Sequence, residues 1–422
     1  MNNTIILDLK ERGLIHDSTN LDTLSEYLQS PRSLYVGFDP TADSLHVGSL
    51  LPLITLKRFA LQGHTPILLI GGGTGLIGDP SGRSSERTLQ SNETIRHWTE
   101  TLQRQVAPLF QEVTACKIID NATWLTKLSL LEFLRDIGKE FTVNYMLAKD
   151  SVAARIKRED TGISFTEFSY MILQAYDFLH LFQTQECAIQ IGGSDQWGNI
   201  TAGCELIRKK TTRQAYGLTL PLLTKADGSK FGKSAEGTIW LDSAKTSAYH
   251  FYQYWVNVAD ADLPHYLQYF SLQPQATIKE IIFASEKQPH LRIGQKSLAA
   301  ELTKLLHGEQ ATKEALSITQ AFFNQSYDSM SIQEFQQIAV GGNSHILTRE
   351  QFQNYTITDL LTSTLIATSK REAREFIKAG AISINAQSQT TDIPINTIIP
   401  YHNKYLIIAK GKKAHILVSI TT

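Results

Sequence analysis

The amino-acid sequence predicts an α/β protein in which a doubly wound parallel sheet is followed by an α-helical domain and a small α+β domain. Residues 33–38 and 65–70 are short apolar runs with the pattern of buried strands, and a helical pattern at 50–62 separates them. Another apolar strand, at 188–191, precedes a glycine-bearing polar segment. Strand, helix and strand in this rhythm are typical of a parallel sheet covered by helices.

The bulk composition is that of a globular protein with more than one domain. A length of 422 residues exceeds one ordinary core, and the 42% apolar and 19% charged content is ordinary for globular chains. The formal net charge of −1 excludes attraction of a polyanion by the whole molecule, so any nucleic acid must meet a local basic patch. Cys116, Cys187 and Cys204 are scattered without metal-ligand spacing, which fits a reducing cytosol.

Neither a targeting segment nor a membrane-spanning segment is expected. Residues 1–12 mix charged side chains with a short apolar run, unlike a signal peptide. The longest apolar stretch, near 66–70, ends in glycines and is too short to span a bilayer. We therefore expect a cytoplasmic protein with no membrane partner.

Changes of pattern along the chain predict a succession of segments. The sheet domain is expected at 1–224 with a helical insertion near 110–165, and a lysine-bearing loop with its connection follows at 225–242. A helical, aromatic-rich domain is expected at 243–323 and a linker rich in Gln, Asn and Ser at 324–355. The last segment, 356–422, combines a basic helix that ends at Gly380 with short Ile-rich strands.

Two motifs far apart in the chain carry residues suited to binding phosphates. The sequence Pro-Thr-Ala-Asp-Ser-Leu-His-Val-Gly-Ser at 40–49 places His46 and Gly48 at the start of a predicted helix, where free N–H groups and the helix dipole favour an anion. The sequence Lys-Phe-Gly-Lys-Ser at 230–234 places two ammonium groups on a loop, where they can neutralise a departing pyrophosphate. Each motif alone fits an ordinary helical turn or a solvated loop equally well, so the prediction depends on the pair.

The run Gly73-Thr-Gly75-Leu-Ile-Gly78 follows a predicted strand and matches the dinucleotide-binding pattern G-x-G-x-x-G. That function needs the third glycine in the first turn of a helix, whereas Asp-Pro-Ser-Gly follows at 79–82 and Asp-Pro signals a turn. A Walker A loop is excluded because no Gly-Lys-Ser/Thr closes the run. We interpret the glycines as positions where the backbone approaches a substrate closely.

Three polar residues share one face of a predicted helix. Tyr170, Gln174 and Asp177 have the spacing i, i+4 and i+7, while the residues at 171–173 are apolar. A solvent-facing polar stripe is the alternative, but such a stripe would rarely be so narrow. The spacing therefore predicts three side chains directed toward one ligand.

These motifs together resemble the bacterial tyrosyl-tRNA synthetases, members of class I of the aminoacyl-tRNA synthetases, over essentially the whole chain. Residues 40–49 resemble the class I HIGH signature and 230–234 its KMSKS signature. Stretches specific to the tyrosine enzymes stand at 35–41, 75–82, 170–177 and 190–198. The tail resembles an S4-type RNA-binding domain, whose Ser-Lys-x-x-Ala-Arg helix stands at 369–374. The resemblance implies a Rossmann-like class I catalytic fold.

The resemblance implies a tyrosine–tRNA ligase that works in two steps. The carboxylate of L-tyrosine attacks the α-phosphate of ATP to give tyrosyl-adenylate and pyrophosphate, and a ribose hydroxyl at the 3′ end of tRNA(Tyr) then takes the tyrosyl group. No protein nucleophile is needed, so catalysis is expected from positioning and charge stabilisation. Mg²⁺ is expected to accompany ATP without a dedicated protein metal site. The residues implied at the phosphates are Thr41, His46, Arg83, Arg87, Lys230, Lys233 and Ser234.

The resemblance also implies which residues hold the two small substrates. Tyr35 and Asp177 are expected at the phenol hydroxyl of tyrosine, so that phenylalanine leaves a buried carboxylate unpaired, an asymmetry for which these enzymes are the standard example. The other implied tyrosine ligands are Asp79, Tyr170 and Gln174 at the α-ammonium and Gln196 near the carboxylate. The residues implied around ATP, besides Lys233, are Gly37, Asp39, Gly48, Ser49, Gly192, Gly193 and Asp195. Ser49 departs from the His or Asn that ends the first signature in many class I enzymes, which leaves its contact open.

Binding of tRNA(Tyr) and dimerisation follow from the same resemblance. The bases implied at the tRNA are Lys370, Arg371, Arg374 and Lys378, for which a merely solvated face is the alternative. Relatives are homodimers joined through the catalytic domain, and the apolar helical stretch at 133–165 is the candidate interface.

Two other functions stay open from the sequence. A tryptophanyl-tRNA synthetase has similar phosphate motifs and would pair Asp177 with an indole N–H, although Tyr35 suits a phenol better. An RNA-binding protein on an inactive synthetase scaffold is the second, and the intact Thr41, His46 and lysine motif argue against it.

Overall fold

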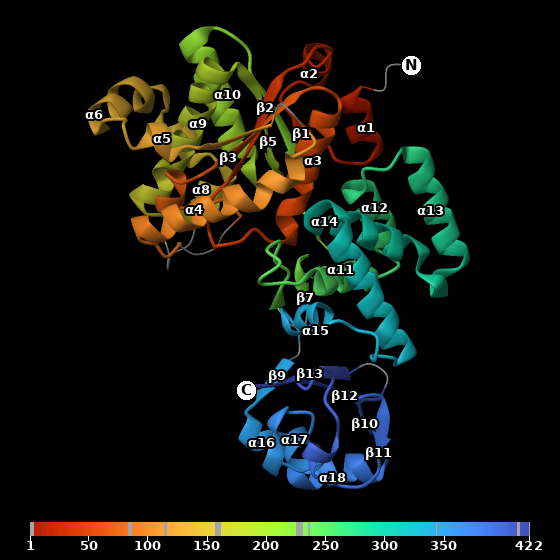
Figure 1. Cartoon of the computed structure of the whole chain (residues 1–422). Coiled ribbons are helices and arrows are strands. Elements are labelled where there is room, and N and C mark those ends of the chain that lie inside the picture. Colours follow the sequence, from red (N-terminus) through yellow and green to blue (C-terminus); the bar gives the residue numbers. More distant parts are fainter. Residues whose placement is uncertain are drawn as a thin grey trace. The chain divides into compact units, whose positions relative to one another are not determined.

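The computed structural model describes residues 4–82, 87–113, 116–156, 162–224, 231–234, 237–342, 344–411 and 414–421 (Figure 1). The chain divides into two compact units. The first consists of Met1–Gly232 and Asp260–Lys287, and the second of Lys233–Ala259 and Gln288–Thr422. The predicted helical domain at 243–323 is therefore wrong as a unit, because residues 260–287 pack with the sheet domain.

The first unit is built on a six-stranded sheet of order β1-β6-β5-β2-β3-β4. Its strands are β1 (Asp17–Ser18), β2 (Ser33–Phe38), β3 (Thr65–Ile70), β4 (Lys117–Asp120), β5 (Cys187–Gly193) and β6 (Tyr216–Leu220). Neighbours pair in parallel, except that β1 is antiparallel to β6. The chain starts the parallel part at β2, runs outward through β3 and β4, and returns on the other side of β2 as β5. The strand order therefore reverses between β2 and β5, which makes this a doubly wound sheet with its switch point there.

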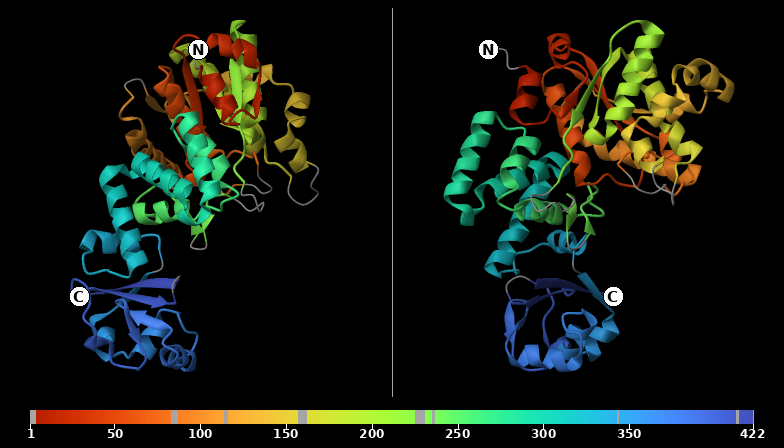
Figure 2. Two further views of the ribbon diagram at one scale, coloured as in Figure 1. Left: turned by 90° about the vertical axis from the view of Figure 1, so that its right-hand side faces the viewer. Right: turned by 180° about the vertical axis from the view of Figure 1, so that it is seen from behind.

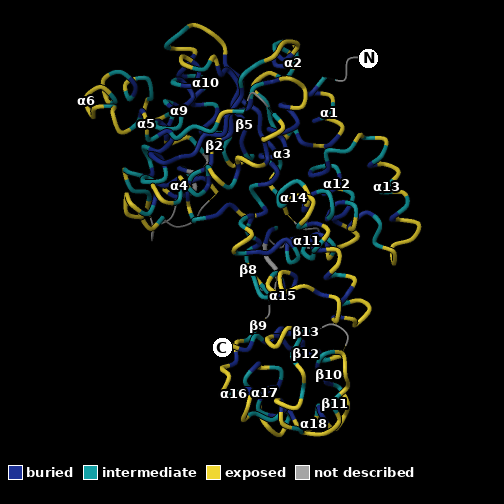
Figure 3. Tube along the Cα trace, viewed as in Figure 1, coloured by how far each residue is buried: buried dark blue, intermediate teal, exposed yellow. Residues whose placement is uncertain are grey.

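Helices cover both faces of this sheet (Figures 1 and 2). Helices α3 (Leu50–Leu61) and α4 (Asn92–Val106) lie on one face, and α9 (Phe165–Gln185) and α10 (Trp197–Thr211) on the other. Right-handed crossovers require this division, because the chain moves in opposite directions from the switch point. The strands between them are buried (Figure 3), with Leu34, Ile67 and Ile189 all fully enclosed. The predicted strands at 33–38 and 65–70 are confirmed, and the helix predicted at 50–62 ends one residue early.

The insertion between α4 and α9 differs from its prediction at its start. Residues 117–120 pair with β3 as the edge strand β4, whereas the whole region near 110–165 was expected to be helical. The reason is that Ile118 and Ile119 are its only apolar residues, too few to show a period. The rest is short helical segments: α5 (Ala122–Leu125), α6 (Leu130–Glu132), α7 (Val143–Leu147) and α8 (Asp150–Ile156).

The remaining helices of the first unit lie at its two sequence ends. They are α1 (Ile5–Glu11), α2 (Leu21–Tyr27), α12 (Leu263–Phe270) and α13 (Gln275–Lys287). Arg12 joins the ends, because its guanidinium donates to the carbonyls of Ser271 and Gln273 at 2.9 and 2.8 Å. These bonds to backbone oxygens help to attach residues 260–287 to this unit.

The second unit combines a helical part with a small sheet. Its helices are α11 (Ala248–Val256), α14 (Ile293–Asn324), α15 (Ile332–Ala339), α16 (Arg349–Asn354), α17 (Ile357–Ser363) and α18 (Lys370–Lys378). The sheet has the order β11-β10-β12-β13-β9, formed by β9 (Ser344–Leu347), β10 (Ile382–Ile384), β11 (Gln387–Gln389), β12 (Tyr405–Lys410) and β13 (Ala414–Ile420). A separate hairpin pairs β7 (Lys233–Ser234) with β8 (Gly237–Thr238).

The predicted linker at 324–355 is wrong, because α15, β9 and α16 lie within it. Part of the polar composition of this segment comes from residues that cap its helices. Ser331 and Glu334 form a reciprocal capping box at the start of α15, whose Phe335 and Ile338 are buried. The basic helix predicted to end at Gly380 is confirmed as α18, and Gly380 takes φ = +61°, as glycine readily does after a helix. Within the described residues, no helix has both the length and the apolar character needed to cross a bilayer.

Candidate active site

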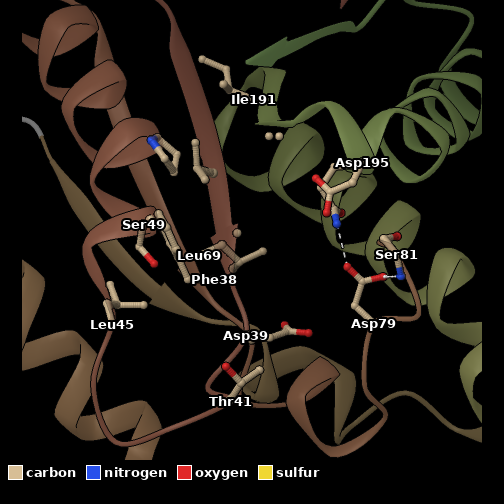
Figure 4. A pocket seen from close by; sticks show the side chains of 18 of the residues that line it. Phe38, Asp39, Thr41, Leu45, Ser49, Leu69, Asp79, Ser81, Ile191 and Asp195 are labelled. Atoms are coloured by element: carbon tan, nitrogen blue, oxygen red, sulfur yellow. Dashed lines mark hydrogen bonds between the residues drawn. The ribbon is translucent and has the colours of Figure 1, made fainter. Parts of the chain in front are cut away.

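A cavity of about 540 Å³ opens at the carboxyl ends of β2 and β5, at the switch point of the sheet (Figure 4). Ligands of doubly wound sheets bind at such a crevice. The sequence-predicted residues that line it are Tyr35, Gly37, Asp39, Thr41, His46, Gly48, Ser49, Asp79, Arg87, Tyr170, Gln174, Asp177, Gly192, Gly193, Asp195 and Gln196. Residues separated by more than a hundred positions in the sequence thus line one cavity.

The second phosphate motif contributes less to the described structure. Arg83 and Lys230 lie outside the described residues. The backbone of Lys233 and Ser234 forms β7, and the side chains of these two residues are outside the described part. Phe231, between the lysines of the motif, lines the cavity and stacks on Phe270 with ring centroids 5.7 Å apart.

The buried end of the cavity contains Asp177, whose two carboxylate oxygens both accept hydrogen bonds. The indole Nε1 of Trp124 donates to Oδ1 at 2.7 Å, and the Nδ2 of Asn121 donates to Oδ2 at 2.8 Å. Burial raises the pKa of Asp177 to about 8, although both donors act to lower it. An enclosed carboxyl with this pKa is ready to accept one further donor, which would stabilise its ionised form.

Tyr35 stands at the same end of the cavity with an unused hydroxyl. Its side chain is 1% exposed, and its hydroxyl has no hydrogen-bond partner among the described residues. Burial raises the pKa of Tyr35 well above its usual value, and the nearby Asp177 adds to the effect. A buried hydroxyl without a partner costs free energy, which a ligand group in the cavity would recover.

Helix α9 presents its narrow polar face to the cavity. The helix begins at Ser164, whose hydroxyl caps it by accepting from the backbone N–H of Glu167. The Tyr170 hydroxyl donates to Asp39 Oδ2 at 2.7 Å, and the Thr74 hydroxyl donates to Asp39 Oδ1 at the same distance. Burial raises the pKa of Asp39 to about 6. The predicted shared face of Tyr170, Gln174 and Asp177 is therefore confirmed geometrically.

Asp79 is the centre of a second polar network in the cavity (Figure 4). Gln196 Nε2 donates to its Oδ2 at 2.6 Å, and the backbone N–H of Ser81 donates to its Oδ1 at 2.9 Å. Gln174 Nε2 donates to Gln196 Oε1 at 3.2 Å, which links the network to α9. Two carboxylates, Asp39 and Asp79, thus line the middle of the cavity, an arrangement that favours a positively charged ligand group.

The open end of the cavity has the start of a helix in its wall, as predicted. His46 precedes a short 3-10 turn at Val47–Ser49, which leads directly into α3. The His46 Nδ1 accepts from the Gly48 N–H at 3.0 Å, so in the neutral ring the proton is on Nε2. Its ring stays accessible, yet the surrounding wall removes enough water to lower the pKa of His46. Neutral imidazole N–H and free backbone N–H groups together suit an anion.

The glycine run at 73–78 does not open an α-helix, as expected from the Asp-Pro turn signal that follows it. Residues Thr74–Leu76 form one 3-10 turn, and Gly78 takes φ = +89°. A Cβ on Gly78 would lie 2.9 Å from the side chain of Arg87, so glycine lets this arginine reach the cavity.

Sequence reasoning missed three residues that shape the site: Thr74, Asn121 and Trp124. Thr74 and Asn121 line the cavity, and Trp124 donates its indole N–H to Asp177. Asn121 is completely buried directly after β4. Recognition of 117–120 as a strand would have pointed to it, because ligand-facing residues follow the carboxyl ends of strands.

Comparison with known proteins agrees with this geometry. Residues 28–324 match the family model described as tRNA synthetases class I (W and Y). Residues 334–418 match the tyrosine–tRNA ligase SYY-like C-terminal domain. The tyrosine–tRNA ligase of Oceanobacillus iheyensis is 47% identical over 99% of both chains, and that of Geobacillus kaustophilus is 46% identical over 98% of this chain and 99% of that one.

Solved structures include one that shares most of the architecture. A C-terminally truncated mitochondrial tyrosyl-tRNA synthetase from Aspergillus nidulans has a TM-score of 0.69 and 31% identity, covering 76% of this chain and 94% of that one. The relatives near 47% identity are tyrosine–tRNA ligases, which decides against the tryptophan alternative. This chain belongs to the bacterial tyrosyl-tRNA synthetases, within class I of the aminoacyl-tRNA synthetases.

Proposed function

We propose that the cavity at the switch point is the place where this tyrosine–tRNA ligase joins L-tyrosine to ATP. The observation that carries the proposal is the pair at the buried end, the unpartnered hydroxyl of Tyr35 and the carboxyl of Asp177. A phenol both donates and accepts, so tyrosine can donate to Asp177 and accept from Tyr35. Phenylalanine can do neither and would leave both groups unpaired in a dry site.

The middle of the cavity receives the amino-acid end of the substrate. Asp79, Tyr170 and Gln174 hold the α-ammonium, with Asp39 adding negative charge. Gln196 lies beside the substrate carboxylate. These groups are already fixed by bonds to one another, so little entropy is lost when tyrosine is oriented for attack.

The open end receives the phosphates. Thr41 and His46 hold them together with the N–H groups at the start of α3. The family resemblance assigns the leaving pyrophosphate to Arg83, Arg87, Lys230, Lys233 and Ser234. A carboxylate oxygen of tyrosine bonds to the α-phosphorus as the bond from that phosphorus to the pyrophosphate oxygen breaks. The charge that builds on pyrophosphate is what these groups stabilise, and no protein nucleophile takes part.

The glycines and the remaining polar residues accommodate the nucleotide. Gly37, Gly192 and Gly193 let ATP lie close to the backbone, while Asp39, Asp195, Gly48 and Ser49 complete the surface around it. The hydroxyl of Ser49 can donate a hydrogen bond at the position where many class I enzymes have His or Asn. Mg²⁺ enters with the phosphates of ATP as part of the substrate.

In the second step a ribose hydroxyl at the 3′ end of tRNA(Tyr) attacks the tyrosyl carbonyl, and AMP leaves. The basic helix α18 contacts the tRNA through Lys370, Arg371, Arg374 and Lys378, which are all exposed. Such phosphate contacts make affinity depend on salt. The bacterial relatives of this chain support a cytoplasmic location beside its tRNA.

The catalytic unit pairs with a second copy through the insertion. Leu131, Leu134, Val143 and Phe165 are large apolar side chains that are 78, 49, 60 and 77% exposed. Figure 3 shows the exposed character of the α6 region. Apolar side chains exposed in this number are typical of an interface. Phe165→Glu is expected to shift sedimentation velocity toward monomer, whereas Phe323→Glu, at a phenylalanine of the second unit that is even more exposed, leaves it unchanged.

Amino-acid-dependent exchange of pyrophosphate into ATP tests the function directly. Exchange with tyrosine alone, across all the common amino acids, is the expected result. Exchange with tryptophan, or no exchange with any amino acid, contradicts the proposal.

The phenol site is tested by Asp177→Ala. This change is expected to lower kcat/KM for tyrosine by a hundredfold or more, which corresponds to the roughly 3 kcal/mol of a lost hydrogen bond to a charged group. The free energy of unfolding is expected to change much less. Loss of activity in step with loss of folded protein would make Asp177 a structural residue.

A further inference from the structure

The two donors to Asp177 are held in place by different means. Asn121 is fixed by hydrogen bonds on both sides of its amide: its Oδ1 accepts from the Gly73 N–H at 2.7 Å, and its Nδ2 also donates to the Thr74 hydroxyl at 2.9 Å. The indole of Trp124 has only one polar group, its N–H, and this N–H donates to Asp177. The position of the Trp124 N–H therefore depends on what packs against its ring.

His180 packs flat against that ring. The ring centroids of Trp124 and His180 are 4.3 Å apart, and the ring planes differ by 19°. Trp124 is 9% exposed, and the buried core of the first unit encloses the rest of it. His180, which covers one face of the indole, is only partly buried.

Few other contacts of the His180 imidazole are present in the described residues. In the described part of the chain no hydrogen bond reaches either of its ring nitrogens, and its remaining ring contact is a tilted one with Tyr176 at 6.4 Å. Burial lowers the pKa of His180, so the ring is neutral at physiological pH. On α9 it lies three residues after Asp177, one helical turn along the same side.

We propose that His180 is a positioning residue for tyrosine specificity. Its stacked ring holds the Trp124 indole in the orientation in which the indole N–H donates to Asp177 Oδ1. The inference rests on the proposed function of Tyr35 and Asp177 as the phenol site. Without the stacked ring the indole can tilt toward solvent, and Asp177 can then turn about its own side-chain torsion. Tyrosine loses a well-placed acceptor, whereas phenylalanine makes no bond there and loses nothing.

The test compares tyrosine and phenylalanine as substrates of pyrophosphate exchange by the full-length enzyme. His180→Ala is expected to raise KM for tyrosine about 2- to 10-fold, the range of one aromatic stacking contact, with kcat within about twofold. The constants for phenylalanine stay the same, so discrimination falls by the same factor. His180→Phe keeps a flat ring and is expected to restore most of the discrimination.

Two further variants separate positioning from general damage. Thr184→Ala, one turn further along the same helix, removes a hydroxyl that donates to the carbonyl of His180, and it is expected to leave discrimination unchanged. Trp124→Phe keeps a ring for stacking and removes the N–H. In that background His180→Ala is expected to add less than about twofold, because the two residues act through the same bond.

The outcomes distinguish this inference from the proposed function. If Asp177→Ala abolishes discrimination and His180→Ala leaves it intact, the inference is overturned and the phenol site stands. If Asp177→Ala itself leaves discrimination intact, the phenol site is overturned, and the inference with it. Equal losses for both amino acids in His180→Ala, together with a lower melting temperature, would overturn positioning in favour of a purely structural role.

Discussion

The hydroxyl of Tyr170 donates to Asp39 Oδ2 over 2.7 Å, and this bond ties helix α9 to the carboxyl end of β2. The other oxygen of Asp39 accepts from Thr74, so the carboxylate is held at both oxygens before any substrate arrives. A preformed carboxylate of this kind favours the ammonium of an amino acid, because its orientation is already determined.

Tyr170→Phe is therefore expected to lower kcat/KM for tyrosine about 10- to 150-fold, since one hydrogen bond to a charged group contributes about 1.5–3 kcal/mol. Steady-state pyrophosphate exchange measures the change. Tyr176→Phe is the matched control, because this half-buried tyrosine of the same helix is not part of the cavity wall. Similar losses in both variants would contradict a specific role for the Tyr170 hydroxyl.

Tyrosine binding is expected to tighten as pH rises from about 5 to about 8. Burial raises the pKa of Asp39 to about 6 and that of Asp177 to about 8, so each holds a proton in the empty site below these values. The ammonium and phenol of tyrosine favour the ionised carboxylates, so binding releases these protons and affinity increases with pH.

Calorimetry in buffers of different ionisation enthalpy would measure the released protons. Phenylalanine lacks the phenol, so its affinity is expected to stop rising once pH exceeds the pKa of Asp39. A tyrosine dissociation constant that is flat over this range would contradict the assignment.

Asp177→Asn is expected to stabilise the protein at pH 8 while impairing tyrosine activation. The pKa of Asp177 is about 8 in the folded chain, compared with about 4 in an unfolded one. Between these values the folded state binds a proton that the unfolded state has released, so wild-type stability falls as pH rises through this window. Asn has no such proton, so this decline is absent in the variant.

Urea unfolding at pH 4.5 and pH 8 checks this sign. The free energy of unfolding of the variant relative to wild type is expected to rise by a few kcal/mol between the two conditions. Asp22→Asn, at an exposed site on α2, should give the same difference at both pH values. A variant less stable than wild type at pH 8 would show that the two bonds to Asp177 outweigh its burial.

The buried ion pair of Arg155 and Glu167 is expected to matter more to folding than the surface pairs. Arg155 Nη2 lies 3.0 Å from Glu167 Oε2, and the two side chains are 2 and 1% exposed. Removal of one partner leaves an enclosed charge, so Glu167→Gln is expected to cost about 3–5 kcal/mol of unfolding free energy. Breaking the exposed pair with Arg208→Gln is expected to cause no measurable change. Equal effects in denaturant titrations would contradict this difference.

Local periodicity was enough to predict the parts of the site that lie on long elements. β2, α3, β3 and the polar face of α9 each have their own repeating pattern, and the resemblance placed them together. The partners of Asp177 could not be predicted in this way. Trp124 stands 53 positions away on a four-residue helix, and only the packing of the insertion brings it to Asp177.

Two of the predicted segments, the helical domain at 243–323 and the linker at 324–355, were wrong for a related physical reason. Ser331 and Thr348 begin α15 and α16 as helix caps, and in sequence such residues resemble a polar linker. Residues 260–287 join the first unit through bonds from Arg12 to backbone carbonyls, which do not depend on the side chains at those positions. Contacts of that kind leave no pattern in the sequence.

The four bases of α18 are expected to contribute unequally to tRNA binding. Lys370 lies 2.7 Å from Asp359, and Arg371 bonds to Glu375, so acids partly neutralise these two. In the part of the chain that the structure describes, Arg374 and Lys378 have no ion pair and are exposed. Arg374→Gln is therefore expected to weaken tRNA(Tyr) binding at low salt more than Lys370→Gln does. It is also expected to make the plot of log K against log salt less steep, by about 1 unit of slope.

Filter binding over a salt series measures this slope, and pyrophosphate exchange without tRNA provides the internal check. Exchange with tyrosine is expected to stay at the wild-type rate in both variants, because the cavity lies in the first unit and α18 in the second. Lys10→Gln, at an exposed base of α1, is the control for a general loss of positive charge. If Lys10→Gln lowers the slope as much as Arg374→Gln does, α18 makes no special contact with the tRNA, because any surface cation would then have the same effect.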